Sequence, residues 1–268
     1  MIRITPDLCE TVIAIAREAG QAILDVYRTP FEVEYKADHS PVTAGDRNAN
    51  KVILDALARL TPDLPIVSEE SAKQPWEVRR HWSSYWLIDP LDGTREFVRR
   101  SDQFSVNIAL VHQGAPVFAV IQSPVEDCLW YAIRGEQACR RDGQKDTVLR
   151  TRIPATAPLR VTTSRTAHGV QTDAMIANMG QVQRLPEGSS LKYCRIAQGD
   201  ADVYPRFGAT CEWDTAAGQC ILQAAGGTVL ALETGKPFRY NRRPTLVNGA
   251  FIALGDPGLP WRDWLPAP

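Results

Sequence analysis

The feature that most constrains the fold is a change in the hydrophobic period of the chain. Up to residue 60, apolar side chains recur three and four positions apart, the spacing that places them on one face of a helix. From residue 104 to residue 133 they alternate with polar or small residues, as in strands with two unlike faces. The chain is therefore predicted to fold as an antiparallel meander behind two helices.

Local signals place the ends of these two helices. Thr5 followed by Pro6 resembles a helix N-cap with proline in the first helical position. Thr43 and Asp46 form a capping-box-like pair at the start of the second helix, and Pro62 closes it.

The second half of the chain has a different organisation. The stretch 153–158 contains two prolines and no periodicity, which makes it the best candidate for a domain boundary. Beyond it, strands at 159–163, 182–185 and 228–232 alternate with helices at 172–179, 190–198 and 214–225. We therefore expect an α+β domain over residues 1–155 and an α/β domain over 156–268, with the active site between them.

Composition excludes several classes of protein. The 268 residues include 30 basic and 31 acidic side chains, so no overall positive field attracts nucleic acid or an anionic membrane. The six cysteines show no CxxC spacing, and acidic residues interrupt the first twenty positions. We expect a cytoplasmic protein with no nucleic-acid partner and no integral membrane association. Peripheral contact with the inner membrane, and the choice between monomer and homodimer, stay open.

Carboxylates cluster where predicted elements begin or end. Glu69 and Glu70 follow a short strand, Asp89 ends the next strand, and Pro90 is expected to stop further strand pairing there. The turn at Asp92 could direct two carboxylates and a main-chain carbonyl at one point, a set of hard oxygen ligands that suits Mg²⁺ or Mn²⁺. Free N–H groups at the start of the following helix could hold phosphate.

Each of these residues also has a purely structural interpretation. Asp92 before glycine is common in turns, and Glu69 with Glu70 could be a solvated pair. Asp214 could face a helix dipole, and Asp46 could only cap a helix. The argument for function rests on the whole set.

Taken together, SEE at 68–70, WLIDPLDGT at 86–94 and EWDTAAG at 212–218 resemble the signature motifs of the inositol monophosphatase superfamily. The resemblance implies a layered α/β/α/β/α sandwich and a Mg²⁺-dependent, lithium-sensitive phosphomonoesterase. The segments TREF at 94–97, SVNIALV at 105–111, GSSLKYC at 188–194 and VYPRFG at 203–208 are similar to the 3'(2'),5'-bisphosphate nucleotidase branch, the CysQ type. Members of that branch remove the 3'-phosphate of adenosine 3',5'-bisphosphate and also act on its sulfated precursor.

The resemblance also implies roles for individual residues. Asp46 and Thr94 would orient and deprotonate the attacking water, and Glu70 would hold water beside the metals. Two or three Mg²⁺ ions, with Mn²⁺ as a possible substitute, would bind a set of carboxylates and one carbonyl: Glu69, Asp89, Leu91, Asp92 and Asp214. The substrate would lie against Glu69, Leu91, Asp92, Gly93, Thr94 and Asp214, with Lys192 and Arg206 as candidates for its second phosphate.

Three functions remain open from the sequence. The first is hydrolysis of a nucleotide bisphosphate to AMP and phosphate. The second is an inositol monophosphatase-like activity with a broader range of sugar phosphates. The third is a non-catalytic, metal-dependent nucleotide sensor. Lys192 and Arg206 could equally be surface charges.

Overall fold

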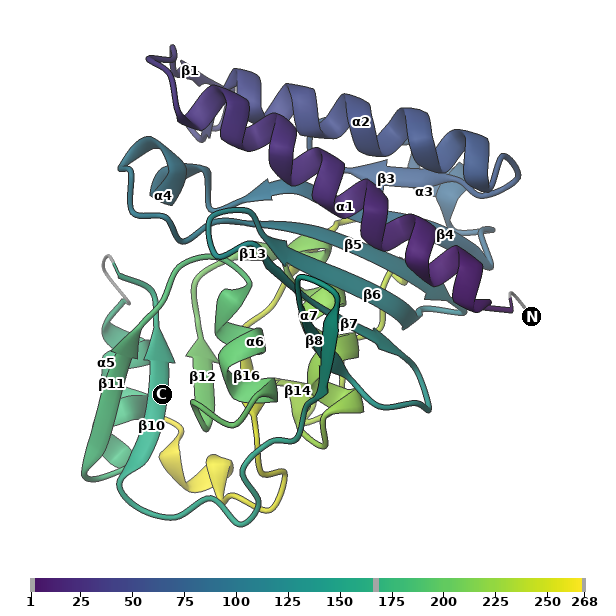
Figure 1. Ribbon diagram of the computed structural model, residues 1–268. Coiled ribbons are helices and arrows are strands. Elements are labelled where there is room, and N and C mark those ends of the chain that lie inside the picture. Colours follow the sequence, from purple (N-terminus) through teal and green to yellow (C-terminus); the bar gives the residue numbers. More distant parts are fainter. Residues whose placement is uncertain (1–2, 166–168, 267–268) are drawn as a thin grey trace.

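Layers of helices and sheets alternate through the molecule. In the computed structural model, which describes residues 3–165 and 169–266, the order is helices, a large sheet, helices, a smaller sheet and helices (Figure 1). The α/β/α/β/α sandwich that was predicted is therefore confirmed.

The outer helical layer holds α1 (Pro6–Tyr27) and α2 (Ala44–Leu60), which cover one face of the large sheet (Figure 1). Both N-caps are as predicted. The side-chain oxygen of Thr5 accepts a hydrogen bond from the main-chain N–H of Leu8, at 3.2 Å. The N–H of Thr43 donates to Asp46 Oδ2 at 2.7 Å, which completes the capping box of α2.

Seven strands form the large sheet in the order of the chain: β3 (Ile66–Ser68), β4 (Ser84–Asp92), β5 (Ser105–His112), β6 (Ala115–Ser123), β7 (Cys128–Ile133), β8 (Cys139–Asp142) and β9 (Lys145–Val148). β3 and β4 are parallel, and the later neighbours are antiparallel, so the predicted meander is confirmed. Two short helices flank β4: α3 (Trp76–Arg79) and α4 (Thr94–Val98).

The expectation that Pro90 ends strand pairing was wrong. β4 continues to Asp92, which pairs with Ser105, while Asp89 pairs with Asn107. Two residues of β4 therefore stand opposite one residue of β5, which is a β-bulge. A bulge tolerates a proline because one residue is left outside the hydrogen-bonding ladder. The strand thus carries both Asp89 and Asp92 to the same edge of the sheet.

The middle helical layer consists of α6 (Leu191–Ala197) and α7 (Glu212–Ala224). Both helices share a core with the large sheet and the smaller sheet. α7 begins at Glu212, two residues before the predicted start. Because this core draws residues from both sides of position 155, the division into 1–155 and 156–268 stays a prediction.

The smaller sheet has the order β11 (Val182–Pro186), β10 (Leu159–Thr163), β12 (Val203–Arg206), β16 (Phe251–Leu254) and β14 (Thr228–Ala231). Its strands alternate between two cores. Tyr204 packs toward α6 and α7, whereas its neighbour Val203 packs toward the outer layer of α5 (Val170–Asn178) and the 3₁₀-helix η1 (Trp261–Trp264).

Two small sheets lie near the ends of other elements. β1 (Glu34–Tyr35) pairs with β2 (Pro41–Val42), and β13 (Thr210–Cys211) pairs with β15 (Val247–Asn248). Among residues 3–165 and 169–266, no helix has the length and apolar character needed to cross a membrane.

Candidate active site

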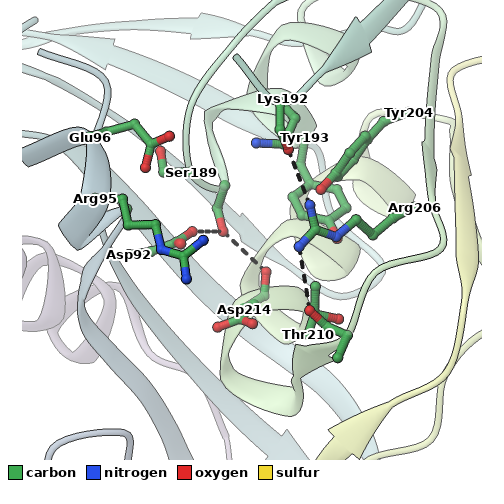
Figure 2. Close-up of a pocket in the computed structure, with 14 residues that line it drawn as sticks. Asp92, Arg95, Glu96, Ser189, Lys192, Tyr193, Tyr204, Arg206, Thr210 and Asp214 are labelled. Carbon is green, nitrogen blue, oxygen red and sulfur yellow. Dashed lines mark hydrogen bonds between the residues drawn. The ribbon is translucent and has the colours of Figure 1, made fainter. Parts of the chain in front are cut away.

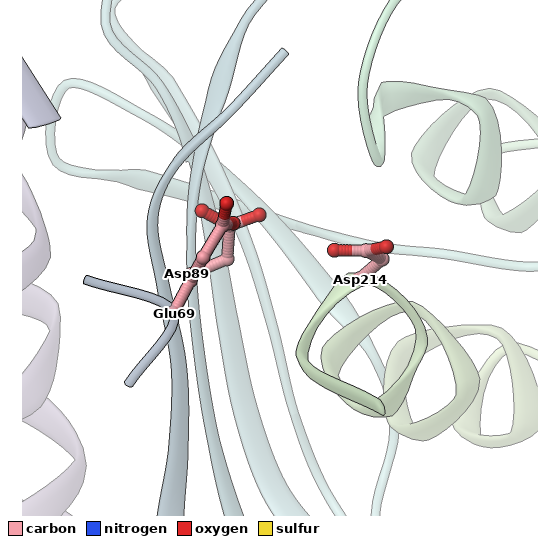
Figure 3. A group of neighbouring side chains, drawn as sticks. All are labelled: Glu69, Asp89 and Asp214. Atoms are coloured by element: carbon pink, nitrogen blue, oxygen red, sulfur yellow. The ribbon is translucent and has the colours of Figure 1, made fainter. Parts of the chain in front are cut away.

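Three carboxylates from separate elements meet at the edge of the large sheet (Figure 3). Glu69 directly follows β3, Asp89 lies in β4, and Asp214 lies in the first turn of α7. Each offers an oxygen that lies within 4.8 Å of the other two. The parallel pairing of β3 with β4 places the first two, since the N–H of Glu69 donates to the carbonyl of Ile88 at 3.1 Å.

The three buried carboxylates repel one another electrostatically. Burial raises the pKa of Asp89 well above its ordinary value, and the charges of Glu69, Asp92 and Asp214 raise it further. Burial, with the charge of Asp92, also raises the pKa of Asp214 well above its ordinary value. A cation would relieve this repulsion. The group contains oxygen donors and neither thiol nor imidazole, which is the ligand chemistry of Mg²⁺.

Lys36 neutralises part of this charge. Its ammonium lies 2.8 Å from Glu69 Oε1 and also forms an ion pair with Glu70. Burial alone would lower the pKa of Lys36, but the hydrogen bonds to both glutamates raise it above its ordinary value. Glu70 is therefore turned toward the hairpin that carries Lys36, beside the group of three carboxylates.

Asp92 has a different environment from these three. Its Oδ2 atom accepts hydrogen bonds from Ser190 Oγ at 2.5 Å and from Asn107 Nδ2 at 3.3 Å. The next residue, Gly93, has a φ of 92°, in the left-handed region. A Cβ atom at Gly93 would also lie 3.2 Å from the Cβ of Ser189, so a side chain here would be both strained and crowded.

Asp46 and Thr94 form a hydrogen-bonded pair beside the end of β4 that carries Asp92. Thr94 Oγ1 lies 3.0 Å from Asp46 Oδ1 and 3.2 Å from the carbonyl oxygen of Leu91. Asp46 is 1% exposed. Burial raises the pKa of Asp46, and hydrogen bonds from Thr43 and Thr94 oppose that rise. Its other oxygen, Oδ2, caps α2, so the helix fixes the direction of Oδ1.

A cavity of about 230 Å³ opens beside the carboxylates (Figure 2). Asp92 and Asp214 form part of its wall, and Lys192 and Arg206 lie across from them. Its other lining residues are Gly93, Arg95, Glu96, Ser164, Ser189, Ser190, Tyr193, Tyr204, Ala209 and Thr210. The cavity therefore has carboxylates on one side, where Arg95 also lies beside Asp92, and the two cations Lys192 and Arg206 on the other side.

Lys192 is not a surface charge, because it is 5% exposed. Its ammonium lies 3.2 Å from the carbonyl of Glu187 and 5.2 Å from the ring centre of Tyr204. Burial lowers the pKa of Lys192 to about 8, although the charge of Asp92 opposes this. Arg206 is partly buried, and its Nη1 atom donates to Ser164 Oγ at 3.1 Å.

Comparison with known proteins identifies the family. The model of the inositol monophosphatase family matches residues 7–254. The chain belongs to the inositol monophosphatase family.

Within the family, the chain is similar to several proteins over nearly its whole length. The 3'(2'),5'-bisphosphate nucleotidase CysQ of Escherichia coli (strain K12) is 42% identical over 246 residues, which cover 91% of this chain and 98% of that protein. The CysQ of Haemophilus influenzae is 34% identical over 267 residues and covers 98% of both chains.

Solved structures of the family show the same fold. The crystal structure of CysQ from Bacteroides thetaiotaomicron superposes with a TM-score of 0.82 at 37% identity and covers 92% of this chain and 97% of that one. An inositol monophosphatase from Zymomonas mobilis gives a TM-score of 0.78 at 25% identity, with 98% of both chains covered.

Several residues around this candidate site could not be identified from the sequence. Lys36 lies on a short hairpin 33 positions before Glu69, and no spacing links the two. Asn107 and Ser190 stand out in the sequence only as members of SVNIALV and GSSLKYC. Their convergence on Asp92 depends on the packing of α6 against the sheet, which no local pattern reveals.

Proposed function

We propose that this chain is a Mg²⁺-dependent 3'(2'),5'-bisphosphate nucleotidase that converts adenosine 3',5'-bisphosphate to AMP and phosphate. The observation that carries the proposal is the two-sided cavity. Asp92 and Asp214 line it together with Lys192 and Arg206, so one phosphate of a nucleotide would lie beside the carboxylates that hold the metal ions and the other beside two cations. The full-length similarity to proteins named as CysQ nucleotidases supports this choice of substrate.

In this proposal the carboxylates and the carbonyl of Leu91 hold the metal ions. Glu69, Asp89 and Asp214 already gather their oxygens within 4.8 Å, and Asp92 borders the same space. Bound Mg²⁺ would lower the pKa of water and neutralise charge on the phosphoryl group. Gly93 lets the main chain approach the 3'-phosphate without a side chain in the way.

Asp46 and Thr94 would act on the attacking water. The hydroxyl of Thr94 donates its proton to Asp46 Oδ1. The lone pairs of Thr94 Oγ1 are therefore free to accept a proton from water. As the water oxygen bonds to phosphorus, the P–O bond to the ribose 3'-oxygen breaks. One water proton passes through Thr94 to Asp46, the other stays on the released phosphate, and the ribose 3'-oxygen takes up a proton from solvent water and leaves as a hydroxyl. Glu70, turned toward Lys36, would hold a further water.

Lys192 and Arg206 would bind the 5'-phosphate, far from the reacting bond. Arg206 offers a planar fork of donors and Lys192 a compact positive charge. Both contribute affinity for a bisphosphate that a monophosphate cannot use. This pairing is what distinguishes the proposed substrate from a general sugar phosphate.

Further details belong to the same proposal. We propose two or three Mg²⁺ ions per site, with Mn²⁺ as a substitute, and a protein that works as a monomer or homodimer. A cytoplasmic location fits the six cysteines, all of which have free thiols. Peripheral contact with the inner membrane stays a prediction that no surface feature of the described residues supports.

Phosphate release tests the function directly. Purified protein with Mg²⁺ should hydrolyse adenosine 3',5'-bisphosphate with a higher kcat/KM than adenosine 3'-monophosphate or inositol 1-phosphate. A preference for inositol 1-phosphate would favour the broader sugar phosphatase. Tight binding of the bisphosphate with no phosphate release would favour a nucleotide sensor.

A further inference from the structure

A chain of buried polar groups leads from β5 to Asp92. Ser105 Oγ donates to Asn107 Oδ1 at 3.2 Å, and Asn107 Nδ2 lies 2.9 Å from Ser190 Oγ and 3.3 Å from Asp92 Oδ2. Ser105, Asn107 and Ser190 are each at most 2% exposed. Ser105 and Asn107 stand two positions apart on one strand, so their side chains share one face of the sheet.

The carboxylate of Asp92 sets the direction of the hydrogen bonds among these buried side chains. The carboxylate of Asp92 can only accept, so the NH₂ group of Asn107 must point toward Asp92 and Ser190, and the amide oxygen of Asn107 then accepts from Ser105 Oγ. Ser190 accepts from that NH₂ group, so its own proton is free for Asp92 Oδ2, the charged acceptor at 2.5 Å. Both donors therefore converge on one oxygen of Asp92.

The other oxygen of Asp92 is left available. Among the residues that the structure describes, Oδ1 of Asp92 accepts no hydrogen bond from the protein, and Asp92 lines the cavity. Holding Oδ2 fixes the rotation of the carboxylate, since two donors approach it from the sheet and from α6. Oδ1 is thereby fixed as the oxygen that faces the site.

The same hydrogen bonds link two ligands that lie far apart in the sequence. The single hydroxyl proton of Ser190 lies between two acceptors: Asp92 Oδ2, at 2.5 Å from Ser190 Oγ, and the main-chain carbonyl of Asp214, at the longer distance of 3.1 Å. Asp92 belongs to the large sheet and Asp214 to α7. Ser190 therefore sets the spacing between them, and Asn107 holds Ser190 in place.

We propose that Asn107 is a positioning residue of the metal site, acting through Ser190 and directly on Asp92. Its amide selects the oxygen of Asp92 that faces the cations and keeps that oxygen at a fixed distance from Asp214. The inference rests on the proposed function only in assuming that Asp92 takes part in Mg²⁺ binding. Partners that orient a ligand in this way typically account for about 10- to 100-fold in metal affinity or activity.

Mg²⁺ binding to the purified, metal-free protein tests this directly by titration calorimetry. Asn107→Leu keeps the size of the side chain but removes its donors, and Ser190→Ala removes the relay. Each is expected to weaken Mg²⁺ binding about 10- to 100-fold. The double variant should lose less than the product of the two single losses, because both act on one oxygen.

Ser84→Ala is the matched control. Ser84 begins the same strand that carries Asp92, is nearly as buried, and its hydroxyl lies 2.7 Å from His112 Nδ1 at the opposite end of the strand. Its Mg²⁺ affinity should stay within about twofold of the parent. The Mg²⁺ concentration for half-maximal phosphate release should rise in the Asn107 and Ser190 variants but not in Ser84→Ala. A general loss of fold would instead lower the melting temperature without raising that Mg²⁺ concentration.

Two results would overturn the proposal. The first is Mg²⁺ affinity of Asn107→Leu within twofold of the parent. The second is an equal loss in Ser84→Ala. Should Asn107→Leu fail to fold, Ser190→Ala decides, because it removes only one oxygen atom. A parent protein that binds Mg²⁺ but releases no phosphate from any nucleotide would refute the proposed function, yet the binding titrations would still test Asn107.

Discussion

The buried position of Lys192 predicts that nucleotide binding depends on pH in a range where few groups titrate. Burial lowers the pKa of its ammonium from 10.5 to about 8, so the charge is present below about pH 8 and is lost above it. If only the charged form binds the 5'-phosphate, the competent fraction falls from about ten-elevenths near pH 7 to about one-eleventh near pH 9. The KM for adenosine 3',5'-bisphosphate should therefore rise about tenfold across this interval.

The assay is initial-rate phosphate release at saturating Mg²⁺ from about pH 7 to about pH 9.5. Adenosine 3'-monophosphate, which lacks the second phosphate, serves as the reference substrate, and its KM should change little. Lys192→Leu should show a high KM for the bisphosphate at every pH. A flat KM in the parent protein, or the same pH dependence in Lys192→Leu, would refute the reasoning.

Lys192→Leu should weaken binding of the bisphosphate but increase the stability of the fold. The difference between 10.5 and about 8 for the pKa of Lys192 corresponds to roughly 3 kcal/mol against the buried charge. Removing that charge should raise the free energy of unfolding by about 1–3 kcal/mol near pH 7. A variant that binds the bisphosphate less tightly but melts at a higher temperature separates loss of a contact from loss of the fold.

Three further outcomes are expected. Excess EDTA should abolish phosphate release and Mg²⁺ should restore it, and full activity in EDTA would contradict the predicted metal dependence. Asp89→Asn should weaken Mg²⁺ binding in a direct titration, because a ligand charge is lost. Asp46→Asn should slow turnover about 10²–10⁴-fold with nearly unchanged Mg²⁺ affinity, and rates within twofold of the parent would return Asp46 to a purely structural role. Asp202 is buried between two arginines, and their hydrogen bonds outweigh the effect of burial and hold its pKa below the ordinary value. Asp202 therefore stabilises the fold above about pH 4 and stabilises it less as the pH falls further. Asp202→Asn should lower the free energy of unfolding by roughly 3 kcal/mol at neutral pH in chemical denaturation and make that free energy depend less on pH in the acid range.

Much of the fold could be predicted from periodicity and caps, because those signals are local. Thr5 and Thr43 marked the starts of α1 and α2, and β10 spans the residues that were predicted. The hairpin of β8 and β9 was missed because its strands, in CRRDGQKDTV, carry mostly charged residues and lack an apolar alternation. The prediction at Pro90 was wrong because a bulge can accommodate a residue that a regular hydrogen-bonding ladder excludes.

In the candidate site, too, residues marked by local signals could be predicted, whereas residues brought together by packing could not. The carboxylates could be predicted as a group because each lies where a predicted element begins or ends, and the strand ends of Glu69 and Asp89 meet at one edge of the sheet. The burial of Lys192 could not be found, because a lysine in a short helix gives no sequence signal of its surroundings. Lys36, Asn107 and Ser190 act across elements, so their part in the site becomes visible only in three dimensions.

The capping geometry of α2 and α7 bears on how inactive relatives should be recognised. Asp46 and Asp214 each use Oδ2 to accept a main-chain N–H at the start of a helix, from Thr43 and Cys211, both at 2.7 Å. The structural interpretation and the proposed chemical role of these residues are therefore compatible, because capping uses only one of the two oxygens of each carboxylate. A descendant that had lost catalysis would still be under selection to keep Asp46 and Asp214 for the sake of its helices. Their presence in a sequence is thus weaker proof of activity than the presence of Thr94, whose hydroxyl caps no helix.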